Sequence, residues 1–471
     1  LMRSSAASDV YKRQVVKMTK SNVVSGKNQS FYKSYFSMTL VIALQNLVVY
    51  SVSLADNVML GGYSELALSG VALCNQIQYF LQMTVMGIGA AMVVLASQFW
   101  GKKDTQSVQK IIAVGFWVAV AVSMLLWCAA FFFPHGCLGL LTDDQEVIGE
   151  GVKYLKIICF TYVFFGMTNT LLAGLRSVET VRIGFLVSGS TLVINVCLNY
   201  LLIYGNFGAP RLGSQGAAIA TLTSRIVEFG IICFYLKAVD RKIRFQFRSL
   251  FRLDREILKK FLRVGSPVIG GDAMWGIAQG AQTAIIGRLG ASAIAANSIS
   301  TTVIQVLTVI IHGSANATGV MTGKWIGAGK IEELKRYAKR LQLVFLALGL
   351  VTGVTLYLVK DFILGFYAIT PETKTMAVHF IIILCITTVG TGYQLNVLTG
   401  FVRGGGDTTF VLINDSIFMW LIVLPASALA AFVFHASPEV VFLCLKSDQI
   451  LKCFVALVKV NRWKWIRVLT Q

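Results

Sequence analysis

Apolar runs long enough to cross a lipid bilayer recur along the whole chain, and they constrain its fold more than any other feature. A membrane-spanning helix needs about 20 mainly apolar residues. Several of the runs exceed about 25 residues, which indicates tilted helices or helices that extend beyond the bilayer. The sequence therefore predicts an all-α integral membrane protein of about twelve transmembrane helices. The twelve runs lie at residues 35–60, 66–99, 107–133, 148–174, 180–204, 214–238, 258–287, 292–325, 336–359, 374–402, 408–434 and 438–459.

The composition also indicates lipid as the solvent. Of the 471 residues, 56% are hydrophobic and 14% are charged, and the mean hydropathy is +0.70. A soluble protein carries about 25% charged residues, and no soluble fold of this size can bury so much apolar surface. The nine cysteines are scattered and form no CxxC motif, so we expect neither disulfides nor a metal site. No nucleotide-binding loop is visible, so we expect no direct use of ATP and no ATP-binding subunit.

The net charge of +20 is concentrated in particular loops. Basic loops alternate strictly with neutral or acidic ones, and lysine and arginine mark the cytoplasmic side of a membrane protein. Both termini are therefore predicted to lie in the cytoplasm, with the chain in a bacterial inner membrane. No aromatic and basic face of the kind that binds nucleic acid is present. The basic set comprises 102–110, 176–182, 237–263, 324–340, 403 and 462–467, and the other set comprises 61–65, 134–150, 371–372 and 437–439.

An internal repeat divides the chain into two halves of six helices. Aligning Gly61 with Gly287 lays Gly61–Gly101 on Gly287–Gly327 without a gap, and further glycines fall at matching places; we call this superposition of the halves the repeat alignment. Because six is an even number, both halves enter the membrane from the same side, so the repeat is parallel with a pseudo-twofold axis along the membrane normal. We predict bundles at 31–236 and 258–460, a basic cytoplasmic linker at 237–257 and a cytoplasmic tail at 461–471. Residues 1–30 are predicted to be an N-terminal tail, with 1–14 a non-native leader and Met18 the natural start.

Ionisable and strongly polar groups inside apolar helices are candidates for function, because lipid cannot solvate them. Asp56 lies near the outer end of the first helix, with no cation three or four residues away. It either ends that helix or serves as a protonatable or cation-binding carboxylate. Asn195 and Asn199 are four residues apart and share one face of the fifth helix. They either make interhelical hydrogen bonds or act as neutral ligands to the same ion.

Asp272 is the corresponding candidate in the second half. It follows Pro267, Gly270 and Gly271 in the seventh helix. Proline removes a backbone hydrogen bond, and the two glycines weaken the helix further. We expect a broken helix beside this carboxylate, which would suit an ion or a substrate.

Other polar and aromatic residues form a second group of predictions. Arg225 and Glu228 are three residues apart, and Asp448 and Lys452 are four apart, so both are expected to be structural ion pairs. Asp415 is either a member of the site or the partner of a nearby arginine. The residues expected to border a substrate cavity, unless they merely pack against lipid, are Gln279, Gln282, Tyr79, Met83, Trp275 and Asp415.

These features together resemble the MATE (multidrug and toxic compound extrusion) family of the MOP flippase superfamily, over roughly residues 30–471. The sequence Asp56–Gly61 resembles the family's aspartate-then-glycine signature, and Pro267 followed by Asp272 and Trp275 resembles the start of its seventh helix. The segments Leu175–Ser177 and Val402–Asp407 look like its repeated loop, and Lys459–Ile466 looks like its tail.

The resemblance implies a monomer that exports organic, often cationic, molecules in exchange for H⁺ or Na⁺ and needs no other cofactor. Asp56 matches the family's cation-binding carboxylate in the first helix. Asn195 and Asn199 match a pair often written Asn…Asp, and Asp272 stands where many members carry Glu. The missing second acid leaves the coupling ion open and puts strong sodium binding in the first half in doubt.

Three alternatives remain beside the antiporter. A lipid-linked oligosaccharide or lipid flippase of the same superfamily usually has fourteen helices or a cavity rich in arginine and lysine. A membrane-embedded prenyl transferase would need paired acids for a metal–diphosphate complex, and the adjacent pair Asp143-Asp144 lies in an outer loop. A channel would be expected to show a filter-like ring. The acidic groups near the predicted cavity favour export of cations.

Overall fold

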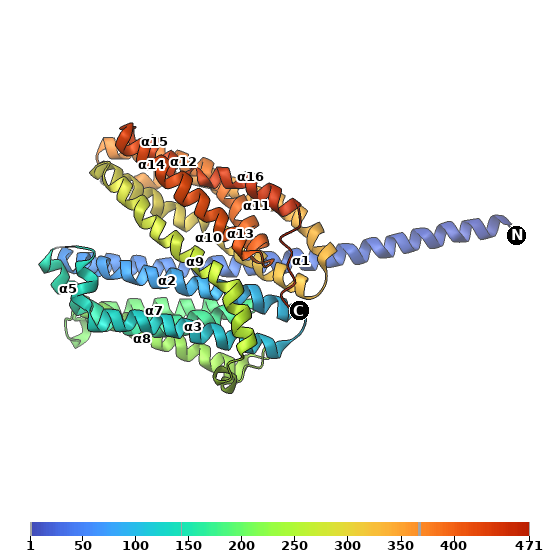
Figure 1. Ribbon diagram of the computed structural model, residues 1–471, viewed down its shortest axis with the longest axis horizontal. Helices are drawn as coiled ribbons and strands as arrows, with labels where there is room; N and C mark the ends of the chain where they lie inside the picture. The colour runs from blue at the N-terminus through green and yellow to red at the C-terminus, as the bar shows by residue number, and fades with distance from the viewer. Residues whose placement is uncertain (1, 143, 366–368, 471) are drawn as a thin grey trace.

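The computed structural model describes residues 2–142, 144–365 and 369–470, and for residues 2–30 it describes the backbone alone. It is built from helices arranged as two bundles (Figure 1). The first bundle contains α1 (Met2–Gly61), α2 (Glu65–Gly101), α3 (Thr105–Phe132), α4 (Pro134–Gly139), α5 (Gln145–Ile158), α6 (Phe160–Ser177), α7 (Arg182–Tyr204), η1 (Asn206–Gly208) and α8 (Ser214–Phe234). The connection contains η2 (Tyr235–Val239) and η3 (Phe247–Phe251). The second bundle contains α9 (Arg255–Gly287), α10 (Ala291–Gly327), α11 (Ile331–Leu364), α12 (Pro371–Leu395), η4 (Asn396–Arg403), α13 (Thr408–Ser416), η5 (Ile417–Val423), α14 (Leu424–Ala428), η6 (Leu429–Val433), α15 (Pro438–Lys446) and α16 (Asp448–Asn461).

The helices account for the twelve predicted membrane crossings. Within the described residues, nine helices are long and apolar enough to span a membrane, and α5 with α6 makes a tenth as a bent pair. The more polar α9 and the interrupted pair α15–α16 occupy the two remaining predicted spans. The prediction of an all-α membrane protein of two six-helix bundles is therefore confirmed.

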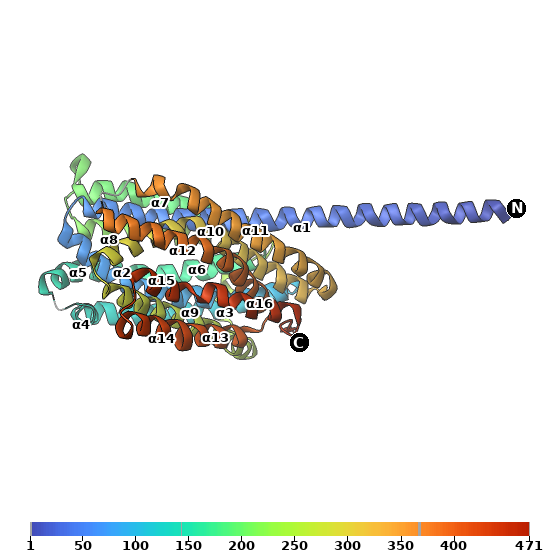
Figure 2. The same cartoon turned by 90° about the horizontal axis from the view of Figure 1, so that it is seen from above.

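The first helix is longer than its predicted span. We expected it to begin near residue 35 and found no helical pattern in residues 1–14, but α1 already begins at Met2. Residues 2–30 contain no proline and a single glycine, Gly26, so no residue there strongly opposes extension of the apolar helix Phe31–Gly61. Figure 2 shows this extension leaving the bundles at the end where the C-terminus lies.

Two predicted spans are interrupted, and one predicted interruption is absent. The run 148–174 bends by 47° between α5 and α6. There the Tyr162 N–H donates to the Cys159 carbonyl, while the Thr161 hydroxyl donates to the Ile158 carbonyl at 2.6 Å. The Thr161 hydroxyl therefore replaces the backbone N–H that the Ile158 carbonyl would accept in an unbent α-helix. The last run likewise divides at Ser447.

The expected break at Pro267 was wrong, because α9 continues through it from Arg255 to Gly287. The helix is held against α2 on both sides of the proline. A side-chain carbon added at Gly265 would lie 3.0 Å from Ala91, and one added at Gly87 would lie 3.0 Å from the backbone of Ile269. This close packing keeps the helix continuous despite the missing hydrogen bond.

The two bundles meet through pairs of helices that are equivalent under the repeat. In the described chain, α9 packs along α2 and α1 packs along α10, and the repeat alignment exchanges these pairs. At one end Gly101 faces the Lys324 carbonyl, while Gly327 faces the Gln98 carbonyl. The repeat alignment converts the first contact into the second, so the structure reproduces the symmetry inferred from the sequence. Glycine is required at both places because the backbones approach too closely for a Cβ atom.

Further contacts join the bundles at this same end, which carries the C-terminus and is called the basic end below. The Lys324 ammonium of α10 lies 2.7 Å from the Glu179 carboxylate after α6. The Gln98 side chain donates to the Arg467 carbonyl at 3.0 Å and accepts from the Leu469 N–H at 2.9 Å. The bundles converge here and diverge toward the ends of α5 and α15 (Figure 1).

Gly327→Ala tests this closely packed contact. The added methyl group would overlap the Gln98 carbonyl, so the two helices must separate, and such overpacking costs about 1–3 kcal/mol. We expect a lower midpoint of thermal unfolding in detergent. Gly280→Ala in α9 is the matched control, since nothing lies within 4 Å of its added carbon. Equal midpoints for both variants would contradict the interpretation.

Candidate functional site

A polar cluster in the first bundle brings together three of the four residues predicted to bind a cation. Asn199 Nδ2 donates to Asp56 Oδ1 at 2.5 Å and to Asn195 Oδ1 at 3.0 Å. Asn195 Nδ2 in turn donates to Thr221 Oγ1 of α8 at 3.1 Å. Both asparagines are fully buried. Their spacing of four residues therefore directs both amides of α7 toward α1 and α8, as expected of one helix face.

The cluster has an excess of hydrogen-bond acceptors. Asn199 uses its amide nitrogen for both of these bonds, and its Oδ1 is buried without a partner. An unsatisfied buried acceptor is costly. A carboxylate, amide oxygens and a hydroxyl are the groups that bind a proton or a hard cation such as Na⁺. The cluster can therefore accept a small cation chemically.

Asp56 differs from the other acids of the membrane region because its hydrogen-bond partner is neutral. In the part of the chain that the structure describes, no basic side chain lies within ion-pair distance of Asp56. The nearest cation on α8, Arg225, lies 2.6 Å from Glu228 Oε2, which confirms that predicted ion pair. Arg225 is thus held by a carboxylate of its own, and it makes no direct ion pair with Asp56. Thr221, one turn before Arg225, was not predicted, although its position on the sixth apolar run was the available signal.

Asp272 lies elsewhere and is bound by an arginine. Arg403 at the end of η4 donates from its two terminal guanidinium nitrogens, Nη1 and Nη2, to the two Asp272 oxygens, each at 2.9 Å. Arg403 is buried, so the bidentate pair is largely removed from water. The sequence placed Arg403 in a basic loop and gave no sign of this pairing, because 131 residues separate the partners. The structure does not bring Asp272 into the Asp56 cluster.

A third charged group lies within the second bundle. The Lys452 ammonium is 2.9 Å from Asp415 and 3.2 Å from Asp448, which confirms the predicted pair of Asp448 with Lys452. Lys452 and Asp448 are buried, whereas the Asp415 side chain is 40% exposed. Asp415 therefore has a lysine partner rather than the arginine that we considered.

The residues predicted to border a substrate cavity fall into two groups. Tyr79 and Met83 lie one turn apart on α2, and Trp275 and Gln279 lie one turn apart on α9. Met83 packs against Gly276, while Tyr79 and Trp275 are exposed, so these four residues border the contact between the two bundles. Gln282 is instead buried within the second bundle, where its Nε2 lies 3.2 Å from Met419 Sδ.

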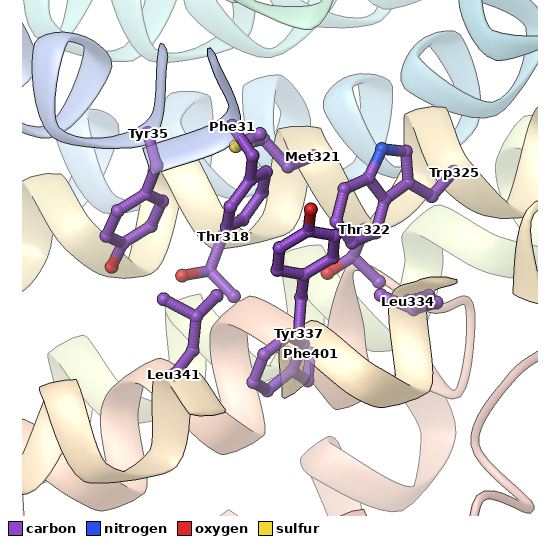
Figure 3. A pocket seen from close by; sticks show the side chains of 10 residues that line it. All are labelled: Phe31, Tyr35, Thr318, Met321, Thr322, Trp325, Leu334, Tyr337, Leu341 and Phe401. Carbon is purple, nitrogen blue, oxygen red and sulfur yellow. The ribbon is translucent and has the colours of Figure 1, made fainter. Parts of the chain in front are cut away.

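The enclosed cavity at the basic end is too small for an organic substrate. It encloses about 10 Å³, roughly the space of one water, and half of its ten lining residues are aromatic (Figure 3). Phe31 of α1 packs there against Tyr337 and Trp325 of the second bundle in tilted ring contacts, with centroids 4.1 and 4.9 Å apart. This is a packing contact that fixes α1 to the second bundle. A larger apolar hollow of about 730 Å³ between α11, α12 and α16 touches none of the predicted site residues.

Known proteins resemble the chain over most of its length. The sequence profile of the MatE family matches residues 42–201 and 267–429. A probable multidrug resistance protein NorM of Listeria monocytogenes is 24% identical over 437 residues, which cover 92% of this chain and 94% of that protein. The multidrug resistance protein MdtK of Yersinia pseudotuberculosis is 23% identical over 401 residues, which cover 84% and 87%.

A solved structure shows the same fold. A mutant of the Vibrio cholerae MATE transporter VcmN superposes with a TM-score of 0.84 at 17% identity, covering 94% of this chain and 98% of that one. The profile matches more than half of the residues, in two segments that fall one in each bundle. The chain is thus a transporter and not an enzyme, and it belongs to the MATE family.

Proposed function

We propose that this chain is a secondary active antiporter, which exports organic and often cationic compounds in exchange for H⁺ or Na⁺. The observation that carries the proposal is the Asp56 cluster. It holds a carboxylate with neutral partners beside the buried, unpaired Asn199 Oδ1. A cation that binds there neutralises the Asp56 carboxylate and gives Asn199 Oδ1 a partner. The acids of the second bundle are already neutralised by arginine or lysine, so an added ion would stabilise them less. The names of the relatives, NorM and MdtK multidrug resistance proteins, support the substrate class.

Helix α1 offers the route from ion binding to movement of the bundles. It carries Asp56 near one end, whereas Phe31 and Tyr35 near the basic end contact the second bundle. The Tyr35 hydroxyl lies 2.5 Å from Ser314 Oγ of α10. A change in the position of α1 on cation binding therefore reaches the contact between the bundles. Ion and substrate can each shift the conformational equilibrium only by their differential affinity for its states.

The orientation follows from charge. The loops at the basic end carry most of the lysine and arginine residues, so we place this end in the cytoplasm of a bacterial cell and Asp56 toward the outside. Protons or sodium ions at high external concentration then reach Asp56 first. Tyr79, Trp275 and the exposed Asp415 offer aromatic and acidic contacts to a flat organic cation. The transporter is proposed to act as a monomer and without ATP.

A lipid-linked oligosaccharide flippase is the second candidate, and one half-buried cation favours it. Arg176 on α6 donates to Asn316 Oδ1 at 3.2 Å, and within the described residues no carboxylate lies within ion-pair distance of it. A half-buried arginine without a carboxylate partner suits a phosphate group. Transport of an anionic lipid headgroup that persists without either gradient, together with no ethidium transport, would favour the flippase.

Asp56→Asn tests the proposed coupling carboxylate. The amide keeps the size of the side chain but cannot carry the negative charge, so we expect ion-driven ethidium transport to fall to the background level. The measurement is ethidium transport by energised everted vesicles, with proton and sodium gradients applied separately. Asp361→Asn, an exposed acid at the end of α11, is the control and should leave transport unchanged. Intact transport by the Asp56 variant would refute the proposal.

Asn199→Asp tests whether the number of charges selects the ion. The substitution places a second carboxylate within hydrogen-bond reach of Asp56, and Na⁺ binding is strengthened by each added negative ligand. We expect sodium-driven transport to rise relative to proton-driven transport. Asn195→Asp provides a comparison one turn away, farther from Asp56. An unchanged ratio in both variants would show that charge at this cluster does not set ion selectivity.

The pair of Asp272 with Arg403 is proposed to be structural. Removing one member of a buried pair costs about 3–5 kcal/mol, because the other charge is left without a partner; since the Asp272 side chain is 28% exposed, the lower part of that range is expected. Arg403→Gln should therefore lower the unfolding midpoint more than Asp272→Asn combined with Arg403→Gln. If the double variant is stable but inactive, the pair has a role in transport as well.

A further inference from the structure

The connection between the bundles is a fixed element that lies over the basic end of α3. Its side chains Ile243, Phe245 and Leu250 are buried in the core of the first bundle. Trp117 Nε1 of α3 donates to the Leu250 carbonyl at 2.7 Å, and Lys110 of α3 lies 2.9 Å from Asp254. The segment from residue 241 to 263 therefore keeps a defined side toward the protein and a defined side away from it.

The side away from the protein is basic. Arg244, whose backbone has a left-handed φ of 51°, is exposed between the buried Ile243 and Phe245. On the first turns of α9 the basic residues recur every four positions, so they form one stripe, opposite the buried side of that helix. Lys242 is also exposed, but its ammonium donates to the Val178 and Glu179 carbonyls. We call the other exposed basic residues of this segment the linker surface; they are Arg241, Arg244, Arg248, Arg252, Arg255, Lys259 and Arg263.

The charges of the linker surface are not neutralised by the protein. In the described part of the chain, none of these seven residues has a carboxylate within ion-pair distance. The nearby acids have other partners: Asp240 accepts from the backbone at Lys242 and Ile243, and Asp254 caps α9 and pairs with Lys110. Glu256, on the first turn of α9, is the exposed acid of the segment. A positive potential therefore faces outward.

Large apolar side chains are exposed among these charges. Phe251 is 77% exposed, Leu253 53% and Leu262 47%. The Phe251 ring lies 6.0 Å from the ring of Trp117 on the spanning helix α3, which is the position of an interfacial aromatic residue. A soluble polyanion would gain from the arginines alone. A bilayer surface would bind through both kinds of side chain, because its phosphates attract the arginines and the boundary of its acyl chains accepts the apolar side chains.

We propose that the linker surface binds anionic phospholipids of the leaflet that it faces. The arginines hold the phosphate groups, and Phe251 and Leu253 enter the boundary between headgroups and acyl chains. Because the segment joins α8 to α9, the bound lipids hold the connection between the two bundles at the membrane surface. The proposal is independent of the transported substrate and of the coupling ion.

Lipid binding by the purified full-length protein tests the proposal. Native mass spectrometry would compare retention of dioleoyl phosphatidylglycerol with that of dioleoyl phosphatidylcholine at equal concentrations. We expect wild type to prefer phosphatidylglycerol. Each basic residue near an anionic surface contributes about fivefold in affinity, so the variant with Arg248→Gln, Arg252→Gln and Arg255→Gln should lose roughly a hundredfold.

A second triple variant provides the matched control. Arg336→Gln with Lys339→Gln and Arg340→Gln removes the same charge from the exposed basic end of α11, where Ile331–Arg340 exposes no large apolar side chain. The control should keep most of the preference. Thermal unfolding in lipid-free detergent shows whether each variant is folded, and Arg252→Gln alone, with about a fivefold loss, serves if the triple variant is not.

Competition distinguishes the membrane from other anions. Glycerol phosphate and polyglutamate should fail to displace phosphatidylglycerol at concentrations where excess lipid succeeds, and Phe251→Ser should weaken lipid retention severalfold. Displacement by glycerol phosphate would indicate a site for soluble phosphate, and displacement by polyglutamate an acidic protein partner. Either result, an equal loss in the control variant, or no preference for phosphatidylglycerol would overturn the proposal.

Discussion

The rest of the structure depends on one constraint, which is that lipid offers no partner to a charge. The protein answers it by pairing embedded acids with basic side chains, as Asp272 pairs with Arg403 and Glu228 with Arg225. Asp56 is the exception among these acids, because amides take the place of a basic partner. A charge left in this condition is tolerated only if something else neutralises it for part of the time. The exception therefore supports the Asp56 cluster as the site of the exchangeable cation that we propose.

The same constraint explains why ion binding at one cluster can affect both bundles. Polar groups at the contact between the bundles also need partners, and these partners belong to the opposite bundle. Tyr35 bonds to Ser314 in this way, and Lys324 pairs with Glu179. These bonds must break or move together when the bundles separate at the basic end. Because α1 carries both Asp56 and Tyr35, the site and this contact are parts of one helix, and no separate mechanical element is needed to connect them.

The sequence predicted what depends on short separations along the chain. The lengths of the apolar runs gave the spans, and spacings of three or four residues gave the shared face of Asn195 and Asn199 and the pair of Arg225 with Glu228. Contacts between distant segments had no such signal, so Arg403 was not recognised as the partner of Asp272. The expected break at Pro267 failed for a related reason, since packing against α2, which the sequence does not display, outweighs the local effect of proline.

The repeat shows why one bundle, and not both, is suited to an exchangeable ion. The repeat alignment places Gln282 at the position of Asp56, and Gln282 is buried against Met419. When the offset of the repeat alignment is increased by one residue, Lys452 aligns with Arg225 and Asp448 aligns with Thr221. The second bundle thus carries a tethered ammonium between two carboxylates, where the first carries neutral ligands beside one acid. A tethered ammonium cannot be exchanged for another ion, so of the two equivalent places only the one in the first bundle fits the coupling ion that we propose.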